Sequence, residues 1–287
     1  MKKLLFLIAI FSAVGLSSCT SQNEPDNSES NTEGLLSGRF SVREDKKVQF
    51  SQGNLQYQAS TKTWRFAEKQ YDFVGDENAN ISSDYSGWID LFAWGTGRNP
   101  TQSSMERTDY VVYDEWGNNA ISNGGNKTKL WKTLDTFEWK YLFYYRSNAG
   151  KLFGLGNVNG VNGTILLPDN WVLPEGVTFT PSREKGLIDD KDNEGNDIMY
   201  NSNEDNYTHN IYTIQQWELM ESAGAVFLPA AGCRFGKYMD FVGTGGSYWS
   251  MTAGGDYKSY YFSYNGFGLS TQSYYDRCTG RSVRLVR

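Results

Sequence analysis

Two segments of the chain follow the same order of residues, and this order constrains the fold more than any other feature. Each begins with a capping box, Asp135 with a glutamate three positions later and Thr213 with a glutamine three positions later. In a capping box these two side chains accept hydrogen bonds from backbone amides that would otherwise lack partners at a helix start. Each predicted helix is followed by an apolar strand that ends in Leu-Pro, at 163–168 and 224–229. The pattern predicts an α+β fold, built either by internal duplication or by equivalent roles within one fold.

Both predicted helices carry a tryptophan on their apolar face. Trp139, Leu142 and Phe143 fall on one face of the first, and Trp217 and Met220 on one face of the second. We interpret both tryptophans as core residues rather than as ligand platforms.

Most other predicted elements are short strands that alternate apolar and polar residues, as a sheet with one buried face requires. They fall at 39–42, 47–50, 55–58, 63–66, 248–250, 258–264 and 282–286. Residues 75–128 are rich in Gly, Asn and Ser and predict a long loop region pinned by Trp88, Trp94 and Trp116.

Composition excludes several classes of protein. Aromatic residues make up 15% of the 287 residues and mean hydropathy is negative, which argues against a heptad-based bundle, a polytopic membrane protein and a charged disordered chain. A single histidine, His209, stands in a polar segment without a nearby nucleophile, so histidine-based catalysis is disfavoured. The net charge is −6 and no basic run occurs, so a nucleic-acid partner is not expected.

The N-terminus predicts export and lipidation. Residues 1–18 combine Lys2 and Lys3 with an apolar stretch too short to span a bilayer, as in a secretory signal peptide. Leu16 to Cys19 resembles the lipobox of bacterial lipoproteins, which implies a lipidated Cys19 and a membrane partner reached through that anchor. Residues 19–36 predict a disordered acidic tether. We therefore expect a protein held at the outer membrane, on its periplasmic or cell-surface face.

Residues 37–287 contain no linker-like segment, so we predict one globular domain. Its part from 37 to 128 is rich in strands and loops. Four ordered motifs in the part from 130 to 287 resemble the Fibrobacter succinogenes major paralogous domain of Bacteroidetes lipoproteins; they lie at 161–171, 225–232, 245–250 and 281–286. This resemblance implies a C-type-lectin-like fold, related to that of formylglycine-generating enzymes, with two short helices, small twisted antiparallel sheets and long loops.

Neither a metal site nor a cysteine site matches a known pattern closely. Asp190, Asp192 and Glu194 resemble the start of a calcium-binding loop, but the glutamate expected at its twelfth position is absent, so a solvated hairpin turn is favoured over weak calcium binding. No cofactor is expected otherwise. Cys233 and Cys278 predict a disulfide in an oxidising compartment, with free thiols as the alternative. Their spacing differs from that of the formylglycine-generating enzymes, which argues against a catalytic pair.

The best candidate for a ligand surface is the tyrosine-rich strand at 258–265. Tyr261 and Asn265 share a face with two serines, a surface that can stack on and hydrogen-bond a sugar or a peptide. We add Trp249, Tyr274 and Tyr275 as candidate ligand-binding residues. The chain as a whole favours a non-enzymatic binding module for an extracellular glycan or protein. The alternatives are a divergent enzyme of the formylglycine-generating or hydrolase type and a structural component of a surface assembly or fimbria.

Overall fold

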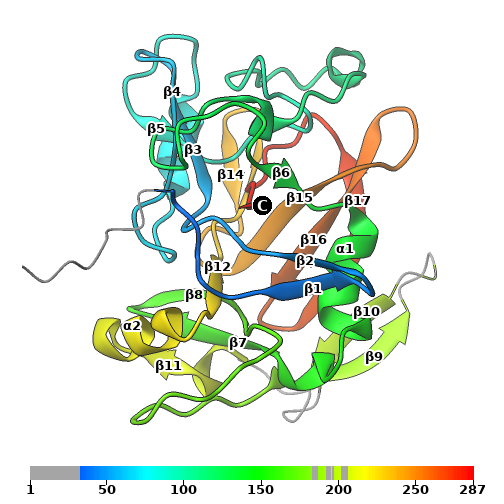
Figure 1. Ribbon diagram of the computed structural model, residues 1–287. Helices are drawn as coiled ribbons and strands as arrows, with labels where there is room; N and C mark the ends of the chain where they lie inside the picture. The colour runs from blue at the N-terminus through cyan, green and yellow to red at the C-terminus, as the bar shows by residue number, and fades with distance from the viewer. Residues whose placement is uncertain (1–32, 183–186, 192–194, 196, 202–205) are drawn as a thin grey trace, which may run out of the picture. The chain divides into compact units, whose positions relative to one another are not determined.

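The structure is a computed structural model that describes residues 33–182, 187–191, 195, 197–201 and 206–287. The signal segment 1–18 and Cys19 lie outside these residues. The described residues belong to one compact unit built from small sheets and short helices (Figure 1). The predicted α+β class is confirmed, since most sheets are small and antiparallel. Among the described residues, no helix is long and apolar enough to cross a membrane.

Six sheets make up the strand framework. The largest has the order β15-β16-β17-β10-β9, formed by Gly245–Ala253, Lys258–Asn265, Gly268–Asp276, Asp197–Asn201 and Leu187–Lys191. The second has the order β11-β7-β8-β12, formed by Ile211–Tyr212, Phe153–Val158, Val161–Leu166 and Val226–Pro229. A third, β4-β3-β5, joins Thr63–Phe66, Leu55–Gln58 and Trp88–Ile89. Three strand pairs complete the set: β1 with β2 (Phe40–Arg43, Lys46–Val48), β13 with β14 (Cys233–Phe235, Tyr238–Asp240) and β18 with β6 (Leu285–Val286, Lys132–Thr133).

The helices are few and short. The α-helices are α1 (Thr136–Lys140), which continues as the π-helix η4 (Tyr141–Tyr145), and α2 (Ile214–Ser222). Short 3₁₀ segments occur at η1 (Gly75–Asn80), η2 (Arg107–Tyr110), η3 (Trp116–Asn118), η5 (Ala149–Lys151) and η7 (Asn206–His209). Most of the region 75–128 is thus loop, in which Trp94 and Trp116 are buried.

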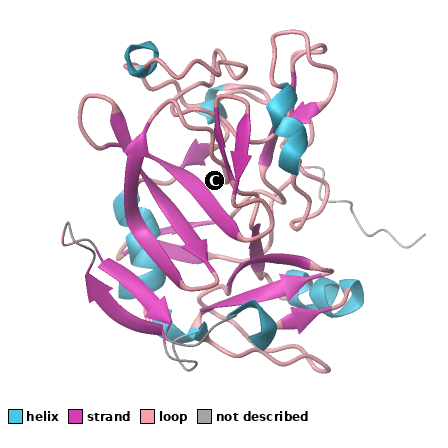
Figure 2. Cartoon of the chain, turned by 180° about the vertical axis from the view of Figure 1, so that it is seen from behind, coloured by secondary structure: helices cyan, strands magenta, loops and turns pink. Residues whose placement is uncertain are grey.

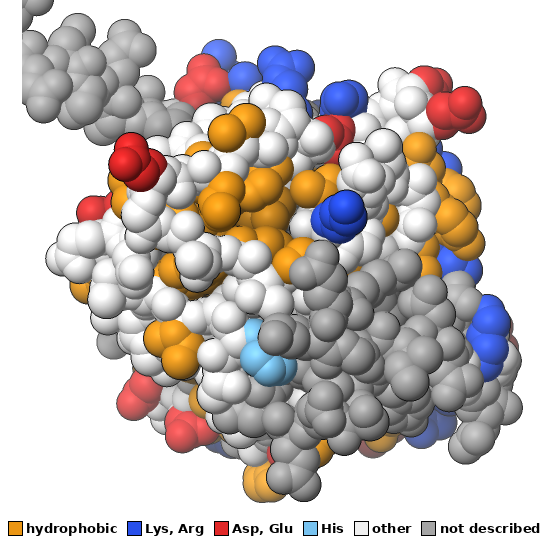
Figure 3. Space-filling model, turned by 90° about the horizontal axis from the view of Figure 1, so that it is seen from below, with side chains coloured by type: hydrophobic (Ala, Val, Ile, Leu, Met, Phe, Trp, Pro, Cys, Tyr) orange, Lys and Arg blue, Asp and Glu red, His pale blue; other side chains and the backbone are white. Residues whose placement is uncertain are grey.

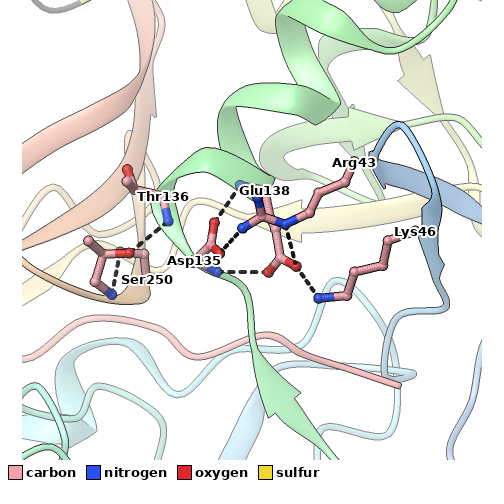
Figure 4. A network of polar contacts seen from close by, with 7 residues as sticks. Arg43, Lys46, Asp135, Thr136, Glu138 and Ser250 are labelled. Carbon is pink, nitrogen blue, oxygen red and sulfur yellow. Dashed lines mark hydrogen bonds and ion pairs between the residues drawn. The ribbon is translucent and has the colours of Figure 1, made fainter.

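Both predicted capping boxes are present. Asp135 accepts a hydrogen bond of 2.7 Å from the amide of Glu138, which accepts one of 3.0 Å in return from the Asp135 amide. Thr213 and Gln216 form the same reciprocal pair at 3.3 and 3.0 Å. The first box is reinforced by Arg43 and Lys46 from the β1–β2 hairpin, which form ion pairs with these carboxylates (Figure 4). The hairpin therefore fixes where α1 begins.

The two predicted Leu-Pro strands pair with each other, although β7 precedes the first of them after α1. β8 and β12 run antiparallel, with Leu166 opposite Val226 and Gly163 opposite Pro229. Their positions in the sheet differ, since β8 lies between β7 and β12 whereas β12 is an edge strand. Gly224 follows the end of helix α2. Its φ is +96°, a left-handed conformation that would strain any residue with a side chain.

The two helix tryptophans are core residues, as predicted. Trp139 is fully buried and stacks on Phe262 of the large sheet, with ring centres 5.1 Å apart and an interplanar angle of 18°. Trp217 packs against Phe227 of β12 in a separate apolar cluster. Helix α1 therefore covers one face of the large sheet. The opposite face of that sheet contacts other segments of the chain.

The fold begins earlier than the predicted tether allows. Leu35 forms an antiparallel bridge with Ser51, and the Leu36 amide donates a 2.9 Å hydrogen bond to the Phe50 carbonyl. Leu36 is buried in the main apolar cluster. The expectation that residues up to 36 are disordered is wrong for 33–36, because both leucines find apolar or backbone partners near the start of the domain.

Candidate ligand-binding pocket

A pocket of about 450 Å³ opens on the face of the large sheet opposite α1. In β16 the side chains of Phe262 and Tyr264 point into the core with α1, so the residues that alternate with them point the other way. Tyr261, Ser263 and Asn265 are these residues, and all three line the pocket. The large sheet is seen from behind in Figure 2. The predicted division of this strand into a core face and a second face therefore matches the structure.

The rest of the wall comes from the β16–β17 hairpin, from β15 and from segments brought in by long-range pairing. These residues are Gly232, Cys233, Phe235, Phe241, Gly245, Gly246, Ser247, Tyr264, Phe267, Gly268, Leu269, Ser270, Tyr275 and Arg281. Gly232 bridges Gly246, and Ser282 bridges Tyr248, so the free edge of β15 is covered by the segments that carry Cys233 and Arg281. The pocket is thus floored by a sheet and walled by chain segments distant in sequence.

Arg281 is the one charged side chain that the described residues contribute to this wall. Its guanidinium carbon lies 3.5 Å from the centre of the Tyr261 ring, 5.1 Å from that of Trp249 and 5.8 Å from that of Tyr275. The side chain is 4% exposed, and rings at these distances attract a cation through their negative faces. The aromatic cage therefore accommodates a buried positive charge without a carboxylate.

The edge of this guanidinium is unsatisfied. Arg281 Nε is shielded from solvent and has no hydrogen-bond partner, and no described residue accepts a hydrogen bond or forms an ion pair with the side chain. Two other buried arginines differ, since Arg146 donates to the carbonyls of Leu142, Leu152 and Leu167, and Arg277 donates to that of Tyr110. Arg284 shares the unpaired Nε but donates from Nη2 to the Gln70 side chain. Arg281 is thus held by ring faces, while its terminal N–H groups, which donate to no described residue, remain available at the pocket.

Two of the five candidate ligand residues do not line the pocket. Trp249 is fully buried, and its indole N–H donates a 2.7 Å hydrogen bond to the Phe92 carbonyl, so it supports Tyr261 and Arg281 from behind. Tyr274 lies beside Tyr260 on the α1 face of the sheet, with ring centres 5.7 Å apart. Adjacent strand residues point to opposite faces, so Tyr274 cannot extend the surface that Tyr275 lines.

The cysteines are both buried and unbonded, contrary to the predicted disulfide. The antiparallel bridge between Arg234 and Gly280 places Cys233 opposite Arg281, three residues beyond Cys278. Cys278 lies in the turn that follows β17, where the Thr279 amide donates a hydrogen bond to the Asp276 carbonyl. Burial raises the pKa of the Cys233 thiol, and the nearby charge of Arg281 offsets part of this rise. Both thiols are therefore expected to be protonated and slow to react near neutral pH.

The acidic loop can be described only in part. Asp192 and Glu194 lie outside the described residues, while Asp190 lies in β9 opposite Ile198. The strands on either side of the loop form the β9–β10 hairpin, and the described residues contain no cluster of three possible metal ligands. His209 is exposed at the surface, where Figure 3 shows it in pale blue.

Sequence reasoning identified Tyr261, Asn265 and Tyr275 but missed Arg281 and the rim residues Phe235, Phe241 and Phe267. One signal was available, since Arg281 stands between Gly280 and Ser282 without an acidic residue beside it. The lack of a partner for Arg281, however, depends on contacts between segments that are distant in the sequence. Comparisons with family models, curated proteins and solved structures return no match at all. The residues of the pocket are therefore the basis for any functional conclusion.

Proposed function

We propose that this protein is a lipid-anchored, non-enzymatic binding module of the outer membrane, and that the pocket beside β16 binds an extracellular glycan. The finer fold description, a C-type-lectin-like domain of the major paralogous type, belongs to the same proposal. It is supported by the four sequence motifs and by the two capped helices that accompany small antiparallel sheets.

One observation carries the glycan assignment: the pocket combines aromatic rings with short polar groups on one rigid sheet. Tyr261, Tyr275 and Phe267 supply rings, and Ser263 and Asn265 supply a hydroxyl and an amide. Sugar rings present apolar C–H faces edged by hydroxyls, so they suit a site that offers both kinds of contact. A peptide that binds by strand addition would need an open strand edge at the pocket, whereas the β15 edge is covered by Gly232 and Ser282.

The arrangement gives less support to an enzyme. The only thiol in the wall, that of Cys233, is buried with a raised pKa and lies apart from Cys278. No described carboxylate lines the pocket, so a pair of acids for glycoside hydrolysis is not assembled there. These features favour binding over turnover.

The test is a glycan-array screen of the full chain, followed by calorimetry on each saccharide that scores. We expect saturable binding that is lost in the Phe267→Ala variant, which removes an exposed ring from the pocket rim. Val112→Ala removes an even more exposed apolar side chain away from the pocket and serves as the matched control. Absence of binding to any saccharide, or equal binding by both variants, would sink the proposal.

A further inference from the structure

We infer that the ligand of this pocket carries a carboxylate, which Arg281 binds, so that the saccharide is acidic. This inference rests on the proposed function and specifies the class of saccharide. Its basis is the contrast between the faces of the Arg281 guanidinium, which pack on rings, and its edge, which has no partner among the described residues.

The geometry of a guanidinium explains why the edge matters. All five N–H donors lie in the plane of the group and point outward from its edge, so ring faces stacked above that plane satisfy none of them. A buried donor without a partner is costly. Because Arg281 is 4% exposed and lines the pocket, a ligand atom seated in the pocket can supply the missing acceptor.

The chemistry of the wall points to a carboxylate rather than to a group of higher charge. Arg281 is the only cation among the lining residues, so it balances a single negative charge. The planar fork of an arginine matches the two oxygens of a carboxylate and binds them with two parallel hydrogen bonds. The cage formed by Tyr261 and Trp249 also holds the fork in place before binding, which reduces the ordering cost.

The surrounding groups fit a sugar ring that bears this carboxylate. Ser263 and Asn265 lie on the same strand face as Tyr261, and Phe267 stands 60% exposed at the rim. The carboxylate would reach Arg281 at the base of the pocket while the rest of the sugar contacts the rings and hydroxyls. A hexuronic acid has this shape.

The experiment compares matched ligands on the full chain in detergent. A panel of hexuronate oligosaccharides is measured by calorimetry beside the same oligosaccharides with methyl-esterified carboxylates, and an acidic peptide is included. We expect at least one acidic oligosaccharide to bind about 10-fold or more tightly than its ester, because hydrogen bonds to charged groups are the stronger class. Since this comparison uses the unmodified protein, it does not depend on any variant folding.

Substitutions then assign the effect to Arg281. Arg281→Gln is expected to abolish the preference for the acid over its ester, and Arg281→Lys, which keeps the charge but not the fork, is expected to retain part of that preference. Arg98→Gln, at an arginine whose side chain is 89% exposed and lies outside this pocket, serves as the control and should change nothing. Thermal melting establishes that each variant is folded.

The outcomes separate the two proposals. Equal affinity for acid and ester overturns the carboxylate inference but leaves the glycan-binding function in place. Failure of every saccharide to bind, both in this panel and on the glycan array, overturns both, whether or not the acidic peptide binds. An acid preference that survives Arg281→Gln overturns the assignment to this residue.

Discussion

The guanidinium of Arg281 lies over the ring of Tyr261 at 3.5 Å, and this contact joins the C-terminal segment to the middle of the large sheet. Tyr261 in turn packs edge-on against the buried Trp249, with ring centres 5.8 Å apart. The base of the pocket is therefore continuous with an apolar cluster that includes Val283 and Leu285. Stability of the core and the shape of the pocket depend on the same residues.

Replacement of Tyr261 tests this dependence. Tyr261→Ala removes the nearest ring from Arg281 and part of the pocket wall, so we expect saccharide affinity to fall by about 10-fold or more. Tyr274→Ala removes a ring of the same size from the opposite face of the same sheet and should leave affinity unchanged. Calorimetry on the two variants decides the matter, and equal losses would contradict the assignment of the binding face.

The cysteines provide a second prediction. In a Cys19→Ser chain, a thiol reagent should titrate two groups in denaturant, since Cys233 and Cys278 are unbonded. The native protein should react much more slowly, because both side chains are buried and burial raises both pKa values. The measurement is the number of thiols modified with time in each condition. A titration of zero thiols in denaturant without reductant would show that the disulfide exists.

Local patterns in the sequence predicted local structure well. The capping boxes at Asp135 and Thr213 are both formed, and the strands at 55–58 and 63–66 have the predicted bounds, because each depends on neighbouring residues. The predicted strand at 282–286 is shorter in the structure, since Ser282 pairs in parallel with Tyr248 instead.

The pocket was predicted only in part, because sequence patterns report on neighbouring residues and much of the pocket depends on distant ones. Alternation along β16 correctly grouped Tyr261 with Asn265, because side-chain period is a local property. The burial of Trp249 follows from its contact with Phe92, which lies more than 150 residues away in the sequence. The missing partner of Arg281 follows from the way distant segments cover the edge of β15. No local pattern contains that information.

The two capping boxes differ in a way that stability measurements can detect. Asp135→Ala removes a cap hydrogen bond and also the ion pair with Arg43, whereas Thr213→Ala removes a cap hydrogen bond alone at an exposed position (Figure 4). We expect Thr213→Ala to lower the free energy of unfolding by about 1 kcal/mol and Asp135→Ala to lower it by more. Denaturant titrations give both values. In an Arg43→Ala background the two losses should become similar, and a difference that persists there would contradict the role of Arg43.

Asp90 makes stability depend on pH in an unusual direction. Its carboxylate is fully buried and accepts hydrogen bonds from the Asn78 side chain at 2.8 Å and the Val74 amide at 2.9 Å, but it forms no ion pair with a described residue. Burial is the dominant cause that raises its pKa from 3.8 to about 6. The folded state therefore holds this proton more tightly than the unfolded state does.

The sign of the effect follows from this difference in proton affinity. The contribution of Asp90 to stability is complete below the unfolded pKa and is lost as the pH rises through about 6. An Asp90→Asn variant loses one acceptor at every pH but has no such titration. The free energy of unfolding of the wild type should thus fall relative to that of Asp90→Asn by about 3 kcal/mol between pH 3.5 and 7. Denaturant titrations of both proteins across that range provide the measurement, and a constant difference between them would show that Asp90 ionises normally.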